Sequence, residues 1–168
     1  SNLTNVLEQQ GVFVLTVDKA PEKFHGISAF ACDASSKICG AGVAYKDGTA
    51  GERQRNTLAH ELGHLAMKVH DCVDEEKAAH RFAGSLLAPA ESIFKTLGKR
   101  RSRLEIAELR LLKQTFGMSM QALILRAKDL NIITPTKCSE LFQFFSRVGW
   151  RKDEPDPLPA EKPTMWQQ

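Results

Sequence analysis

The first fifty residues show one helical and three extended patterns of apolar residues. Residues 3–10 have the spacing of a short helix that ends at Gly11. Three runs rich in apolar and β-branched residues follow at 12–17, 27–32 and 38–45, separated by polar and turn-forming residues. These runs predict a small antiparallel sheet at the N-terminal end of the chain.

From Arg53 onward the apolar residues return at intervals of three and four, which is the helical pattern. The first such stretch covers residues 53–69, and the second covers residues 74–88 and ends before Pro89. In the second stretch, five apolar residues define a stripe that we expect to be buried: Ala79, Phe82, Ala83, Leu86 and Leu87.

Three more helices are predicted in the second half of the chain. Residues 104–116 and 120–130 are amphipathic and are joined at Gly117, with Ser119 as the N-cap of the second helix. Residues 141–148 form the last apolar helix. These patterns predict an α+β fold, in which a small N-terminal antiparallel sheet packs on a mostly helical domain.

The composition changes after Trp150. Four of the seven prolines fall among charged residues beyond this point, where a helix cannot continue. A chain of 168 residues with 42% apolar content is long enough to bury one core. We therefore expect one domain over residues 1–150 and an extended or disordered tail over residues 151–168.

Charge and targeting signals exclude several classes of protein. Lysine and arginine number 23 against 20 acidic residues, and this net charge of +3 is too small to make nucleic acid or an anionic membrane the main partner. The sequence has no CxxC pair, no signal peptide and no apolar run that could span a bilayer, so a cytoplasmic protein with reduced thiols is expected. Because Ser1 is not an initiator methionine, the chain is compatible with being a piece of a longer protein.

The segment from His60 to His64 has the pattern His-Glu-x-x-His on a strongly periodic helix. At about 100° per residue, positions four apart lie one turn above each other, so both imidazoles can bind one ion. Glu61 lies one residue round the helix, where its carboxylate can take a proton from an attacking water. The pattern predicts metal-assisted peptide hydrolysis, with Glu61 as general base, in preference to a merely solvated polar helix face.

A catalytic zinc site needs a third protein ligand and one open position. His70 has the spacing of the metzincin pattern, but Met67 stands where that pattern has a glycine to turn the chain. Glu76 lies on the next helix, one turn before Ala79, at the border of the expected buried stripe. We therefore predict Glu76 as the third ligand. The expected cofactor is one divalent ion, with zinc favoured and manganese also compatible with two imidazoles and a carboxylate.

His80 follows Glu76 by one helical turn. Its imidazole could donate a hydrogen bond that orients Glu76 or a metal-bound group. A partly buried histidine without such a role is the alternative, and the sequence leaves both open. Asp74 and Glu75 are interpreted as first-turn acids that complement the helix dipole.

Three stretches together resemble the ImmA/IrrE-type metallopeptidases: residues 53–64, 76–89 and 116–151. The resemblance implies a zincin-like metallopeptidase domain in which Glu76 falls on the family's third metal ligand. It also implies a protein or peptide substrate, because the family includes proteins that cleave helix-turn-helix repressors and so release stress-response or mobile-element genes. The sequence departs from the family at Asn56, where an aromatic is common, and at His80, where asparagine is usual.

Other interpretations compete with catalysis. Residues 111–130 could form a helix-turn-helix, but the apolar run 122–125 indicates core packing, and the basic run 99–103 is typical of a solvated loop. Direct nucleic-acid binding and membrane binding are therefore not expected. A catalytically silent metal-binding module that docks a helix-turn-helix regulator stays open as the alternative function. If the domain is a peptidase, we expect the strand at 38–45 to hold an extended substrate by edge pairing.

Overall fold

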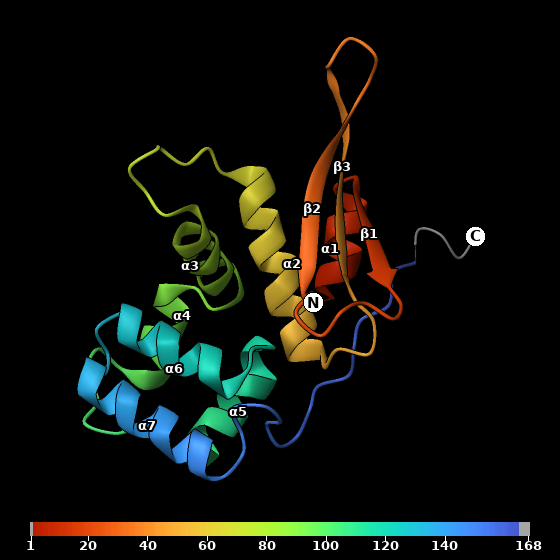
Figure 1. The fold of residues 1–168 in the computed structure, drawn as a ribbon. Helices are drawn as coiled ribbons and strands as arrows, with labels where there is room; N and C mark the ends of the chain where they lie inside the picture. The colour runs from red at the N-terminus through yellow and green to blue at the C-terminus, as the bar shows by residue number, and fades with distance from the viewer. Residues whose placement is uncertain (1, 165–168) are drawn as a thin grey trace. The chain divides into compact units, whose positions relative to one another are not determined.

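The computed structural model describes residues 2–164, and its helices and small sheet confirm the predicted α+β class (Figure 1). The chain forms two compact units: unit 1 runs to Ala83 and includes the segment from Pro159, and unit 2 covers Gly84–Leu158. The predicted division into a 1–150 domain and a 151–168 tail stays a prediction. The elements are α1 (Leu3–Gln9), β1 (Val12–Val17), β2 (Gly26–Cys32), β3 (Ile38–Lys46), α2 (Gly51–Ala66), α3 (Glu75–Leu87), α4 (Ala90–Leu97), α5 (Ile106–Phe116), α6 (Met120–Asp129) and α7 (Pro135–Arg147).

The sheet of unit 1 has the strand order β1-β3-β2. Strands β2 and β3 form an antiparallel hairpin, as predicted, but β1 is parallel to β3, so the prediction of a wholly antiparallel sheet is wrong. An apolar run shows that a segment is extended and does not show which neighbour it pairs with. The pairing of β1 is decided by burial, because Val14 lies opposite Val43 and both side chains are almost fully buried.

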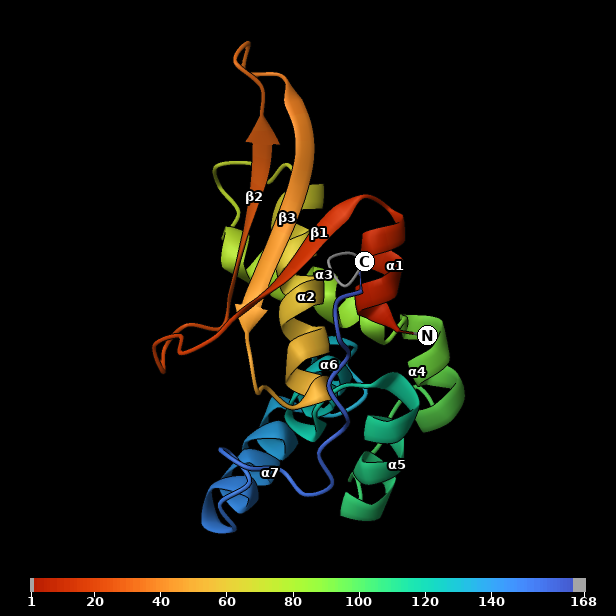
Figure 2. The same cartoon turned by 90° about the vertical axis from the view of Figure 1, so that its right-hand side faces the viewer.

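The two faces of this sheet differ. Val14, Val43 and Tyr45 lie on the face that packs against α1 and α2, and Figure 2 shows α2 behind the strands. Side chains alternate between faces, so the neighbouring residues Phe13, Leu15 and Ile27 lie on the opposite face. Their exposed fractions of 39%, 46% and 58% leave that second face apolar and open to solvent.

Helix α2 carries the His-Glu-x-x-His pattern and ends at Ala66, three residues before the predicted end at Val69. Met67 has extended backbone angles, with φ −105° and ψ 138°. The chain therefore leaves the helix without a left-handed turn, and His70 lies in the exposed loop that leads to α3. In α3, Leu86 was expected in the buried stripe, but it is 43% exposed.

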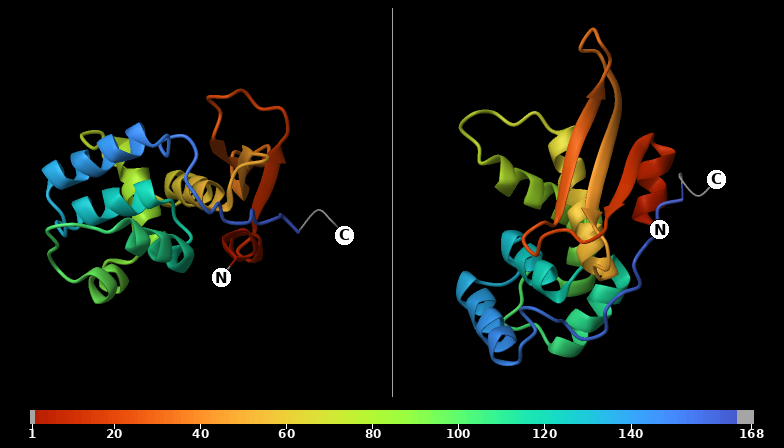
Figure 3. Two further views of the ribbon diagram at one scale, coloured as in Figure 1. Left: turned by 90° about the horizontal axis from the view of Figure 1, so that it is seen from below. Right: turned by 45° about the vertical axis from the view of Figure 1, so that its right-hand side comes forward.

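Unit 2 is helical, and Figure 3 shows α6 and α7 side by side. Helix α4 was not predicted, because a proline after an apolar stripe indicates the end of a helix, whereas the extended backbone of Pro89 makes it the N-cap of a new helix. Helix α7 begins at Pro135, six residues before the predicted start, with Thr134 as its N-cap. The predicted signals at Gly117 and Ser119 are confirmed: Gly117 is left-handed, and Ser119 accepts a hydrogen bond from the Ala122 backbone N–H.

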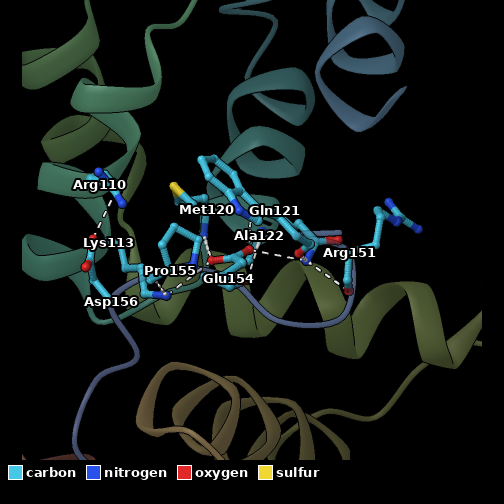
Figure 4. Close-up of polar contacts among 11 residues, drawn as sticks. Arg110, Lys113, Met120, Gln121, Ala122, Arg151, Glu154, Pro155 and Asp156 are labelled. Atoms are coloured by element: carbon cyan, nitrogen blue, oxygen red, sulfur yellow. Dashed lines mark hydrogen bonds and ion pairs between the residues drawn. The ribbon is translucent and has the colours of Figure 1, made fainter. Parts of the chain in front are cut away.

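After α7, the chain binds unit 2 through Glu154 (Figure 4). The Glu154 carboxylate accepts hydrogen bonds from the Met120 and Gln121 backbone N–H groups at the start of α6, at 2.8 and 3.0 Å. It also forms an ion pair with Lys113 at 3.3 Å, in which the side chains are 3% and 0% exposed respectively. Burial and full pairing make this contact part of the core of unit 2.

Further along, Glu161 binds unit 1. Its backbone N–H and C=O exchange hydrogen bonds with the Gln54 side chain at 2.7 and 2.6 Å. Its carboxylate accepts a hydrogen bond from the Thr4 backbone N–H and forms an ion pair with Arg55. Gln54 is fully buried, so this segment contributes to the packing of α1 and α2.

None of the helices in the described range combines the length and apolarity needed to cross a lipid bilayer. All four cysteines lie in that range and are unpaired.

Candidate metal centre

His60 and His64 lie one turn apart on α2, and their Nε2 atoms are 3.1 Å from each other. Glu76 from α3 reaches both rings: its carboxylate oxygens lie 3.3 Å from Nε2 of His60 and 3.4 Å from Nε2 of His64. We call these three residues the donor triad. Within residues 2–164, it is the one group of three or more such side chains close enough to hold a metal ion.

The spacing of the donor triad can be compared with what one ion requires. Two ligand atoms about 2.05 Å from a zinc ion, at the tetrahedral angle, lie about 3.3 Å from each other. The two Nε2 atoms are 3.1 Å apart, Oε2 of Glu76 lies 3.3 Å from that of His60, and Oε1 of Glu76 lies 3.4 Å from that of His64, so the donor triad suits a shared ion. The Glu76 side chain is 69% exposed, so the triad is open to solvent on that side and can leave a position for water.

A glycine on α2 allows α3 to come this close. A Cβ atom at Gly63 would lie 3.2 Å from Cδ1 of Phe82 and 3.3 Å from Cα of Ala79, tighter than ordinary packing. Ala79 is fully buried in this contact. Because Glu76 lies one turn before Ala79, the close contact at Gly63 carries the carboxylate to the two histidines.

The surroundings of His60 favour its neutral form. Burial, followed by the nearby His80, lowers the pKa of His60, and the neutral imidazole is the form that binds metal. The His80 ring lies 4.4 Å from that of His60, centroid to centroid, and forms no hydrogen bond with Glu76 among the described residues. The Nδ1 atom of His60 is buried and has no hydrogen-bond partner in the described part of the chain. The ring is therefore oriented by its Nε2 contacts and by His80.

Glu75 contacts the site, which the sequence analysis did not predict. Its Oε1 lies 3.1 Å from Nδ1 of His64, on the ring edge opposite Nε2. A carboxylate in this position orients a metal-binding imidazole and fixes the nitrogen that carries the proton. Its place at the first turn of α3 suggested only a dipole role, since helical spacing alone does not reveal which acid faces a second helix.

Glu61 lies beside the donor triad on α2 and is only 8% exposed. Its Oε2 accepts a hydrogen bond from the Ser28 hydroxyl on β2 at 2.8 Å. Ser28 is the second residue at the site that the sequence did not indicate, because it lies 33 positions away with no motif around it.

His70, the competing candidate ligand, lies outside the donor triad. It is exposed in the loop after α2, where its Nδ1 is 3.3 Å from Sγ of Cys72. The early end of α2 at Ala66 separates it from the helix face that carries His60 and His64.

A sheet packed on a helix whose two histidines meet a glutamate from the next helix defines a metallopeptidase-type domain. The chain belongs to the peptidase family described as the IrrE N-terminal-like domain, whose family model matches residues 8–128. This match confirms the resemblance to ImmA/IrrE-type proteins.

A solved structure of a Mycobacterium tuberculosis transcriptional regulator is similar to this chain, with a TM-score of 0.51 and 14% sequence identity. The match covers 75% of this chain and 40% of that protein, so the chain spans well under half the length of this relative. At this identity the likeness shows the fold alone. No curated protein matches the sequence significantly.

Proposed function

We propose that this chain is a metal-dependent endopeptidase domain, in which His60, His64 and Glu76 bind one divalent ion and Glu61 is the general base. The observation that carries the proposal is the donor triad, in which two imidazole nitrogens and a carboxylate lie close enough together to hold one ion, with a buried carboxylate beside them. Zinc is the expected ion, and manganese suits the same ligands.

The residues divide the chemistry of hydrolysis between them. A bound ion would polarise the scissile carbonyl and lower the pKa of an attacking water. Glu61 takes one proton from that water as its oxygen bonds to the carbonyl carbon, and gives the proton to the amine nitrogen as the C–N bond breaks. Glu75 keeps the His64 ring in its ligand orientation, and we propose that His80 supports the His60 ring in the same way.

The substrate strand was expected to pair with residues 38–45, and that expectation is wrong, because β3 lies in the middle of the sheet with both edges occupied. The free edge beside α2 belongs to β2. His25 accepts a hydrogen bond from the Lys46 backbone N–H, so the antiparallel alternation directs the main-chain groups of Gly26, Ser28 and Phe30 outward. We propose that an extended peptide pairs with this edge, next to Glu61.

The family membership supports a protein substrate, and the relative titled a transcriptional regulator agrees with a regulatory one. On this basis we propose that the natural substrate is a regulatory protein such as a helix-turn-helix repressor, with a role in transcription regulation and the stress response. Incubation of the purified chain with a candidate repressor, followed by mass spectrometry of the products, tests this step. If the repressor stays intact while a peptide substrate is cleaved, the proposal of a repressor substrate is wrong and the proposal of a peptidase stands.

Metal binding is tested by elemental analysis of protein purified without added metal. We expect about one divalent ion per chain, lost in His64→Ala and retained in His70→Ala, because His70 lies outside the donor triad. Circular dichroism checks that both variants are folded. Equal metal content in the two variants would contradict the proposed site.

Catalysis is tested with Glu61→Gln, which keeps the size of the side chain and removes the base. We expect this variant to retain the ion and to lose hydrolysis of a quenched fluorescent peptide library. Hydrolysis that survives in Glu61→Gln would exclude Glu61 as the base.

The alternative is a catalytically silent module that docks a helix-turn-helix regulator, and one observation supports it. Phe13, Leu15 and Ile27 form an exposed apolar group on the sheet face opposite α2. This alternative predicts that Glu61→Gln retains regulation in cells, whereas Phe13→Ser loses it. The peptidase proposal predicts that regulation is lost in Glu61→Gln.

A further inference from the structure

The general base of the proposed site has a partner on the sheet. Oε2 of Glu61 accepts the hydrogen bond from the Ser28 hydroxyl at 2.8 Å, and this is the one hydrogen bond of that carboxylate among the described residues. Glu61 is 8% exposed, so water competes little for this contact. The other carboxylate oxygen, Oε1, has no hydrogen-bond partner in the described part of the chain.

Glycine at position 26 makes the contact possible. A Cβ atom there would lie 2.4 Å from Cγ2 of Thr57 and 3.2 Å from Cγ of Glu61, so a larger residue would push α2 away from β2. Ser28 lies two residues further along β2 and therefore points to the same face as position 26. The close approach at Gly26 thus brings the Ser28 hydroxyl within reach of the Glu61 carboxylate.

We propose that Ser28 is a positioning residue for Glu61: its hydroxyl holds Oε2, so that Oε1 faces the attacking water. A glutamate side chain has three rotatable torsions, and one charge-assisted hydrogen bond selects the productive orientation before substrate arrives. The inference rests on the proposed peptidase function. It gives strand β2 two roles: its main chain pairs with the substrate, and the Ser28 side chain orients the general base Glu61.

The test compares Ser28→Ala with Ser28→Thr, which restores the hydroxyl. The substrate is the peptide cleaved fastest in a quenched decapeptide library with randomised central positions. We expect Ser28→Ala to lower kcat by about 10- to 100-fold with little change in KM, because only the orientation of the base is lost. Ser28→Thr should recover most of the rate. Ser35→Ala, the same change at the hairpin turn, should match the wild type, since the hydrogen bonds of Ser35 within residues 2–164 go to Asp33.

Metal binding separates positioning from packing. The metal affinity of Ser28→Ala should equal that of the wild type, because Ser28 is not a member of the donor triad. Its urea midpoint should fall slightly, because one hydrogen bond to a nearly buried carboxylate is lost. A Ser28→Ala variant that loses metal along with its rate, or a Ser28→Thr variant as slow as Ser28→Ala, would assign Ser28 to packing and overturn the inference. If kcat is unchanged in Ser28→Ala while Glu61→Gln is inactive, the inference about Ser28 is overturned and the peptidase proposal stands. A wild-type chain that cleaves no library peptide would overturn both.

Discussion

Replacing Glu154 by glutamine would remove the negative charge that is buried against Lys113 in unit 2. The two side chains are 3% and 0% exposed and their charged atoms are 3.3 Å apart. Glutamine keeps the shape and one carbonyl oxygen, so the hydrogen bonds to the start of α6 can be retained in part. The Lys113 ammonium would keep its contact with the Pro155 carbonyl at 3.0 Å but would lose the Glu154 carboxylate as a partner.

The magnitude follows from burial. Removing one partner of a buried ion pair costs about 3–5 kcal/mol, and a hydrogen bond to a charged group contributes about 1.5–3 kcal/mol. Because the Lys113 ammonium keeps other contacts, among them the Pro155 carbonyl, the expected loss is near the lower end of the first range, at about 3 kcal/mol.

Unfolding in urea, followed by Trp150 fluorescence, measures the effect. The Trp150 ring packs against Phe144 and Phe145, with centroids 5.8 and 5.5 Å away, so its emission reports on unit 2. The sequence has two tryptophans, and Trp166→Phe removes the second from the signal. A loss of about 3 kcal/mol should lower the urea midpoint by about 1–3 M.

Asp156 provides the matched control. It forms an ion pair with Arg110 at 3.0 Å in the same segment, but these side chains are 56% and 46% exposed (Figure 4). Asp156→Asn should therefore cost about 1 kcal/mol or less. A Glu154→Gln variant as stable as the wild type, or one that loses no more stability than Asp156→Asn, would refute the argument that burial makes the Glu154 ion pair stabilising.

Three further expectations follow from the structure. Gly63→Ala should push α3 away from α2 and lower the metal affinity measured by calorimetry about 10-fold. Gly84→Ala should leave the affinity unchanged, because a Cβ atom there would meet Arg126 Cδ at an ordinary 3.5 Å. Equal affinities in the two variants would contradict the argument that Gly63 sets the spacing of the two helices. Burial, followed by the charge of Asp47, raises the pKa of Tyr45 from 10.0 to about 12, so folding favours the protonated phenol, and stability that is complete below pH 10 should fall by about 3 kcal/mol as the pH rises through 12. Tyr45 is the only tyrosine, so ultraviolet titration follows it alone, and a midpoint near 10 in folded protein would contradict this. Glu161→Gln should destabilise unit 1 by about 1–3 kcal/mol, because the charged contacts of Glu161 with Thr4 and Arg55 are lost. Thermal unfolding followed by circular dichroism measures this, and an unchanged melting temperature would show that these contacts contribute little to the stability of unit 1.

Sequence periodicity predicted the elements of unit 1 well and their assembly less well. The strands at 12–17, 27–32 and 38–45 match β1, β2 and β3 within one residue at each end. Their order could not be predicted, because pairing depends on contacts across the chain. The same limit explains α4: an eight-residue helix directly after Pro89 offers too short a pattern to separate from a loop.

The site shows the same division. His60, Glu61 and His64 could be recognised because, on a helix, the spacing of residues along the sequence fixes the direction in which each side chain points. Glu76 could be predicted because it borders the apolar stripe of α3, which has to face a neighbour. Glu75 and Ser28 could not, since their roles depend on where a second helix and a strand lie against α2.

From its residues alone, this chain determines an α+β fold, a helix with two histidines one turn apart and a glutamate next to the first, and an acid at the start of the following helix. These features are local, and a few backbone torsions repeated along the chain are enough to generate them. Three-dimensional packing determines what remains: that β3 separates β1 from β2, that Ser28 reaches Glu61, and that Glu154 and Glu161 bind partners 41 and 107 residues away. Contacts over such separations depend on how whole elements bury their surfaces together, and no spacing within one element records them.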